Sequence, residues 1–190
     1  ALKTTTAAFV DDVSGNFQVA TANCPAGQKV LAGGFSGADG DFATTNKALD
    51  ADTWVVAGEF QPTAKAFAYC SAGLTVEAVQ ATVAVPAYSP TEGADNSRSS
   101  QVKCPRGTRV VSGGWEFSPF AGNSPVYASK PRTRKTWIVS GVYDGGVDFE
   151  VTAYAYCMRG VDATTVTATT PVAAGGMGTA TATCATGRLI

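Results

Sequence analysis

Apolar and polar residues alternate along most of the chain, in short runs interrupted by Gly, Pro or Asp. In the first part of the sequence, four such runs predict β-strands at 17–24, 29–35, 53–60 and 65–70. Runs rich in Thr, Val and Ala have a similar character and predict further strands at 4–10, 76–85 and 163–170. No segment has a convincing helical pattern. The sequence therefore predicts an all-β protein.

The chain also repeats itself. Residues 24–35, Cys-Pro-Ala-Gly-Gln-Lys-Val-Leu-Ala-Gly-Gly-Phe, align without gaps with residues 104–115, which lie 80 positions later. Two further anchors follow in the same order, a Thr-Trp segment at 53–58 and 136–141 and a closing aromatic-Ala-Tyr-Cys segment that ends at Cys70 and Cys157. A third copy starts at Cys184. We divide the chain into unit 1 (1–75), unit 2 (76–162) and the start of an incomplete unit 3 (163–190).

Each unit carries two glycine signals. The Cys-Pro-x-Gly stretch predicts a tight turn that links two adjacent strands, because Pro fixes φ and Gly permits positive φ. The pairs Gly33-Gly34 and Gly113-Gly114 fall inside strand-like sequence, where a missing side chain indicates a bulge or a close backbone approach. The predicted fold is a tandem of disulfide-closed antiparallel β-repeats, in a β-prism-like pseudo-threefold or a sandwich arrangement.

The cysteines follow the repeat. Cys24 with Cys70 and Cys104 with Cys157 are the natural disulfide pairs, which leaves Cys184 as a free or intermolecular thiol. No two cysteines are close in sequence and the chain has no His, so structural zinc is not expected. Disulfides indicate an oxidising compartment. Together with the start at Ala1 without Met, which suggests a removed signal peptide, they predict a secreted, extracellular protein.

The pattern Cys-Pro-x-Gly-x-x-Val-x-x-Gly-Gly-aromatic, followed by a Thr-Trp strand and a closing Tyr-Cys strand, resembles modules found in many secreted bacterial proteins, mostly of unassigned function. The resemblance covers roughly residues 17–160 as two units, plus a fragment. It implies secretion and the same disulfide pairs, and it carries no catalytic residues.

Unit 3 would leave an unpaired cysteine and an open sheet edge. Three explanations are open. These 190 residues could be part of a longer chain that completes the unit; the terminal strand could pair with another subunit by β-strand addition; or it could close a ring of sheets within the chain.

The composition narrows the possible functions. Charged residues make up 15% of the chain and the net charge is −1. The charges are unevenly distributed: residues 98–135 hold eight bases and the single acid Glu116, whereas residues 1–97 hold ten acids and four bases. Such a split suits head-to-tail association or an anionic surface polymer. Nucleic acid is not an expected partner, because aromatic residues are not interleaved with the basic cluster. No apolar run is long enough to predict a membrane span.

Chemistry that depends on histidine is excluded, so triads, Cys-His dyads and His-based metal sites are not expected. Close acid pairs fall in or near predicted turns, where Asp serves turn geometry. No enzyme activity, metal or cofactor is predicted. The three Trp residues occupy strand positions typical of a core. The better binding candidates lie in and after the longer loop of unit 2: Phe117, Phe120, Tyr127, Arg132 and Arg134.

From these features we expect a non-enzymatic structural or adaptor subunit of a secreted or surface assembly, such as a fibre, a surface layer or a toxin particle. It would act through β-strand pairing and surface contacts, with segment 163–190 reaching other subunits. The alternative is a carbohydrate-binding or adhesion module for a cell-surface glycan.

Overall fold

The structure is a computed structural model that describes residues 2–11, 17–38, 40–86, 97–118, 126–142, 148–162, 164–172 and 180–185. All regular elements in these ranges are strands, which confirms the all-β prediction. The strands of the first half are β1 (Lys3–Ala8), β2 (Val10–Asp11), β3 (Gln18–Asn23), β4 (Gln28–Ser36), β5 (Phe42–Ala48), β6 (Thr53–Glu59) and β7 (Lys65–Ala72). Those of the second half are β8 (Glu77–Val85), β9 (Ser97–Lys103), β10 (Thr108–Ser118), β11 (Val126–Thr133), β12 (Thr136–Val142) and β13 (Phe149–Arg159).

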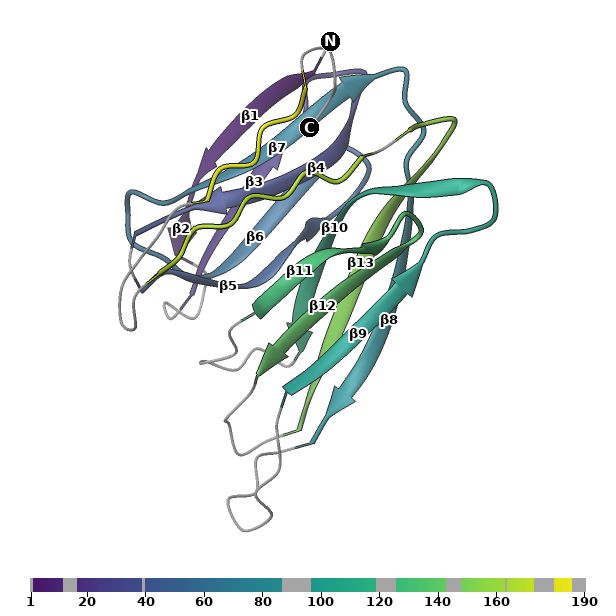
Figure 1. Cartoon of the computed structure of the whole chain (residues 1–190). Coiled ribbons are helices and arrows are strands. Elements are labelled where there is room, and N and C mark those ends of the chain that lie inside the picture. Colours follow the sequence, from purple (N-terminus) through teal and green to yellow (C-terminus); the bar gives the residue numbers. More distant parts are fainter. Residues whose placement is uncertain are drawn as a thin grey trace.

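The strands form three antiparallel sheets, in the orders β1-β7-β4, β2-β3-β6-β5-β10-β13-β8 and β11-β12-β9. In the first half, β4 contacts β5 and β6, and β3 contacts β1 and β7, so two layers face each other. In the second half, β9 and β12 contact β13 in the same way. The two halves are consecutive bodies along the long axis of the molecule, joined where β5 meets β10 (Figure 1).

The Cys-Pro-x-Gly stretches are tight turns, closed by hydrogen bonds from Gln28 N–H to the Pro25 carbonyl (3.0 Å) and from Thr108 N–H to the Pro105 carbonyl (3.2 Å). Gly27 and Gly107 have φ of 78° and 83°, which side chains disfavour. The prediction that each turn joins adjacent strands is wrong. Each turn carries the chain from one sheet to the other, because β3 and β4, like β9 and β10, belong to different sheets.

Two buried clusters form the core, one centred in each half, and Tyr156 of the second half belongs to the first cluster. In the first, Trp54 is fully buried over Gly33, where an added Cβ would lie 2.3 Å from the indole. In the second, Trp137 lies over Gly113 with the corresponding distance at 2.2 Å. Trp115 and Trp137 are only half-buried but pack against these clusters. At the first glycine of each Gly-Gly pair, the absence of a side chain therefore leaves the room that a tryptophan ring occupies.

Gly33→Ala is expected to lower the free energy of unfolding by about 1–3 kcal/mol, because the new methyl group overlaps the Trp54 ring. Gly34→Ala is the matched control, since an added Cβ at Gly34 meets nothing within 4 Å. Urea unfolding of both variants checks this prediction. A loss of stability at position 34 equal to that at position 33 would contradict it.

Two disulfides tie the layers together. Cys24, just after β3, bonds to Cys70 on β7, and Cys104, just after β9, bonds to Cys157 on β13. Their Cα–Cα distances are 5.6 and 5.8 Å, within the usual range. These are the pairs that the sequence predicts. Each one links the two sheets of its half beside the cross-sheet turn.

Residues 164–172 differ from the prediction, because they form no strand and are exposed. The two similar Thr/Val/Ala-rich runs, predicted at 4–10 and 76–85, form strands because each has a strand to pair with: β1 pairs with β7, and β8 pairs with β13. The other edge of β7 is paired with β4 and that of β13 with β10, so neither strand has a free edge for a third run. Over the part of the chain that is described, no helix has the length and apolar character needed to cross a membrane.

Candidate functional site

The junction of the two halves is a short antiparallel pairing of β5 with β10. Asn46 lies opposite Trp115 and Thr45 lies opposite Glu116. Close approach depends on Gly114, where an added Cβ would lie 2.3 Å from the Asn46 carbonyl oxygen. The Trp115 indole donates to the Ala43 carbonyl at 3.3 Å. The second glycine of this Gly-Gly pair thus makes room for a neighbouring strand.

A polar network lies over this pairing. Lys47 Nζ is 2.6 Å from Glu116 Oε2 and donates to the Tyr154 hydroxyl at 3.1 Å. The Tyr154 hydroxyl donates to the same Glu116 oxygen at 2.7 Å, and Lys47 Nζ lies 4.9 Å from the centre of the Tyr154 ring. Because Lys47 comes from β5 and the other two groups come from β10 and β13, this network fixes one half on the other.

Tyr156 completes the junction from the same strand. Its hydroxyl accepts a hydrogen bond from Ala48 N–H at 2.6 Å, and its ring lies 5.5 Å from that of Trp54. Burial raises the pKa of Tyr156 above its ordinary value, and nearby Tyr154 and Glu116 add to the shift. The pKa of Tyr154 is also raised, mainly by burial and to a smaller extent by the Glu116 carboxylate. Both phenols are thereby held neutral.

The stability of the junction is expected to fall as pH rises past about 10. There Tyr154 and Tyr156 lose their protons in the unfolded chain and keep them in the folded chain, so that the unfolded state binds fewer protons. Urea midpoints measured from pH 9 to pH 11, with Cys184 alkylated, test this expectation. Tyr156→Phe should make the decline shallower, whereas Tyr127→Phe, at an exposed side chain, should not. An equally steep decline in the Tyr156 variant would contradict the assignment.

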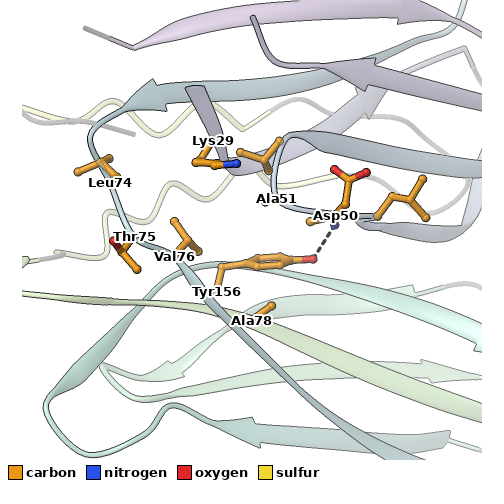
Figure 2. A pocket seen from close by; sticks show the side chains of 11 residues that line it. Lys29, Asp50, Ala51, Leu74, Thr75, Val76, Ala78 and Tyr156 are labelled. Carbon is orange, nitrogen blue, oxygen red and sulfur yellow. Dashed lines mark hydrogen bonds between the residues drawn. The ribbon is translucent and has the colours of Figure 1, made fainter. Parts of the chain in front are cut away.

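A cavity of about 450 Å³ opens beside Tyr156, between the halves. The start of β4 and the β5–β6 turn line it from the first half, Leu74, Thr75 and Val76 from the connecting segment, and Ala78 and Tyr156 from the second half. Figure 2 shows Lys29 and Leu74 across the cavity from Tyr156 and Ala78, with the Asp50 carboxylate near the end of the Tyr156 ring. The lining of the cavity thus combines the aromatic ring of Tyr156 with the cationic side chain of Lys29 and the anionic side chain of Asp50.

Those predicted binding residues that the structure describes are not brought together. Phe117 is a correction: it is buried, with 3% of its surface exposed, and packs edge-to-face on Phe149 at 5.6 Å. It points inward because β10 continues to Ser118. Phe120 lies outside the described residues. Tyr127 is 60% exposed at one end of β11, and Arg132 is exposed near the other end, where it donates to Gln101 Oε1 at 2.6 Å.

The remaining basic candidate, Arg134, lies in the exposed turn after β11, where its carbonyl accepts from Val110 N–H at 3.0 Å. Cys184 is a free, half-buried thiol. Among the described residues, no group of three or more Cys, Asp or Glu side chains is placed to hold a metal ion. Asp50 and Asp52 lie in the exposed β5–β6 turn, where Asp50 Oδ1 accepts from Asp52 N–H at 3.0 Å, as expected of turn residues.

Sequence reasoning missed the junction network. Tyr154 and Tyr156 were visible only as part of the closing aromatic-Ala-Tyr-Cys repeat. Lys47 and Glu116 carry no local signal, because they lie 69 positions apart and neither belongs to a repeated anchor. The only available hint was Gly114, which a close strand approach explains.

The chain matches no protein-family model, and no curated protein matches it.

Proposed function

We propose that this protein is an extracellular, non-enzymatic structural or adaptor subunit of a secreted or surface assembly, acting through β-strand pairing and surface contacts. The carrying observation is the β5–β10 junction, in which one half recognises the other through a strand edge and a compact ionic network. Two disulfides fit an extracellular compartment. A fibre, a surface layer or a toxin particle would use such contacts repeatedly.

The two halves support the proposal because they are alike in detail. The β4–β7 and β10–β13 pairings each have a bulge at the same repeat position, between Val30 and Ala32 and between Val110 and Ser112. Trp54 Nε1 donates to Asn46 Oδ1 at 2.7 Å, and Trp137 Nε1 donates to Ser129 Oγ at 3.1 Å. We take the halves as two copies of one disulfide-closed unit, of which the pseudo-threefold arrangement would hold three.

The proposal predicts oligomers that grow with concentration, measured by sedimentation velocity on the whole chain. Deleting residues 163–190 tests whether this segment carries the contact; its described residues, 164–172 and 180–185, are exposed except for Cys184. Loss of the oligomers on deletion would assign the contact to the segment. A monomer at every concentration, with no partner retained from culture medium, would sink the assembly proposal.

A carbohydrate-binding or adhesion module is the second candidate. The cavity beside Tyr156 favours it, because the exposed side chains of Lys29 and Asp50 in its lining offer hydrogen bonds to the hydroxyl groups of a sugar. Glycan-array binding that is lost in Asp50→Asn and kept in Asp162→Asn, at an exposed carboxylate outside the cavity, would favour this reading. An array with no signal would remove it.

A further inference from the structure

The strand edges used at the β5–β10 junction have counterparts elsewhere in the chain. In the order of the sheets, β4 holds the place in the first half that β10 holds in the second, and β11 holds the place of β5. Within the described structure, β4 and β11 each end a sheet and pair with a strand on one side only. The chain therefore presents both members of a strand pair that it has already used once.

Gly34 lies at a point of β4 where, in the described structure, no strand is paired with the edge that faces away from β7. Its counterpart Gly114 must lack a side chain because the Asn46 carbonyl approaches it. At Gly34, by contrast, an added Cβ would meet nothing within 4 Å, and φ is not positive. Nothing in the described part of the first half requires glycine at this position. The open space beside Gly34 corresponds in position to the one that β5 fills beside Gly114.

The register that β11 would take along β4 follows from the β5–β10 junction. Ser129 corresponds to Asn46, since each accepts from the tryptophan of its half. Phe35 and Ser36 correspond to Trp115 and Glu116. A strand pair built on the same plan would place Ser129 opposite Phe35 and Ala128 opposite Ser36.

The first part of the β4 edge is already occupied. Val30 N–H donates to the Ala51 carbonyl at 3.0 Å, and the Leu31 carbonyl accepts from the Ser112 hydroxyl. The open stretch is thus the end of β4, from Gly33 onward. This is the same short stretch that β10 uses, where only two residue pairs join it to β5.

Charge also favours pairing of β11 with β4. Lys130 takes the place of Lys47, and Phe67 that of Tyr154, so a cation could again lie over a ring. Ser36 replaces the acid Glu116, but the Asp41 carboxylate lies against Gly37, the next residue after β4. It is held there by Ala38 N–H and Gln61 N–H at 2.6 and 2.7 Å.

One contact of the internal junction is lost in this pairing. Pro131 replaces Ala48 and has no N–H to donate to Tyr69, the counterpart of Tyr156. Pro131 follows the two residues that would form the strand pair, so it limits the length of the pairing without blocking it. The contact should be weaker than the internal junction.

We propose that β11 of one molecule pairs antiparallel with β4 of a second copy, repeating the β5–β10 junction between molecules. This inference rests on the proposed function and names the partner and the surface. The contact is heterologous, because it joins two different edges, so repeating it builds a ring or an open filament rather than a closed twofold dimer.

Gly34→Val tests the edge, because its branched side chain would occupy the space that the second strand needs, and its Cβ would meet nothing within 4 Å in the monomer. We expect self-association, measured by sedimentation velocity, to weaken at least tenfold while the unfolding midpoint does not fall, because valine is a better strand residue than glycine. Ala84→Val, on the exposed outer strand β8, is the matched control and should associate like the parent chain.

Cysteine pairing tests the register in a Cys184→Ser background. Mixing a Ser36→Cys chain with an Ala128→Cys chain should give a covalent heterodimer under mild oxidation, because directly opposed strand residues suit a disulfide. Ser36→Cys mixed with Ser129→Cys should not, since one step along a strand turns the side chain to the other face.

Oligomers that persist in Gly34→Val, with no selective Ser36–Ala128 crosslink, would overturn this inference and leave the assembly proposal standing. A parent chain that stays monomeric at every concentration and forms no crosslink would overturn the pairing of copies directly. A tenfold weakening together with the selective crosslink establishes both.

Discussion

Replacing Trp54 by alanine is expected to lower the free energy of unfolding by about 3–5 kcal/mol, the range for deleting a large buried aromatic side chain. Trp54 is 0% exposed and fills the space above Gly33. Its Nε1–H also satisfies the Asn46 side chain, which is itself buried, so the substitution strands a buried oxygen in addition to leaving a cavity. Because Asn46 belongs to the junction strand, the loss should also loosen the contact between the halves.

Denaturant unfolding of Trp54→Ala, compared with Trp137→Ala, measures this effect. Trp137 has the same position in the second half but is half-buried, so its removal should cost less. Trp54→Phe should fall between the parent chain and Trp54→Ala, because it keeps part of the ring and loses the hydrogen bond. A larger loss for Trp137→Ala would contradict the assignment of Trp54 as the more deeply buried anchor.

Removing the Cys24–Cys70 disulfide with two alanine substitutions is expected to cost about 4 kcal/mol, from the chain entropy of a loop of 46 residues. The Cys104–Cys157 bond spans 53 residues and should contribute nearly the same amount. Both disulfides stabilise the protein mainly by lowering the entropy of the unfolded chain. Their removal should therefore lower the unfolding midpoint and change the near-ultraviolet spectrum of the native protein only a little.

Thermal unfolding of the two double variants checks this prediction, with Cys184→Ala as the matched control. Cys184 has no disulfide partner, so its substitution should leave the midpoint almost unchanged. A loss in the control as large as in the double variants would mean that Cys184 takes part in a stabilising bond, contrary to the structure.

The sequence predicts those features that depend on short-range pattern. The strands on either side of each Cys-Pro-x-Gly turn, the disulfide pairs and the tryptophan positions all follow from alternation and from the repeat. β5 was missed because Phe-Ala-Thr-Thr-Asn-Lys-Ala has little apolar alternation. β11 was missed for a similar reason, since Lys130, Pro131 and Arg132 suit an edge strand more than a core.

The candidate site was harder to predict because it depends on which strands become neighbours. The repeat motif ends at Trp115, and the two residues that follow it have opposite fates. Phe117 points into the core, whereas Glu116 meets a lysine from the other half of the chain. Nothing local marks either outcome, since both are set by the length of β10 and by its pairing with β5.

The two disulfides also set how the molecule would respond to a pulling force. A force applied to the chain ends passes through each sulfur–sulfur bond and bypasses the residues between its cysteines, which are 46 and 53 positions apart. At roughly 3.4 Å per extended residue, each bond withholds on the order of 160–180 Å of chain from extension. Only the end segments and the connection from Cys70 to Cys104 can lengthen, so under oxidising conditions the molecule would act as a short tether with a built-in limit.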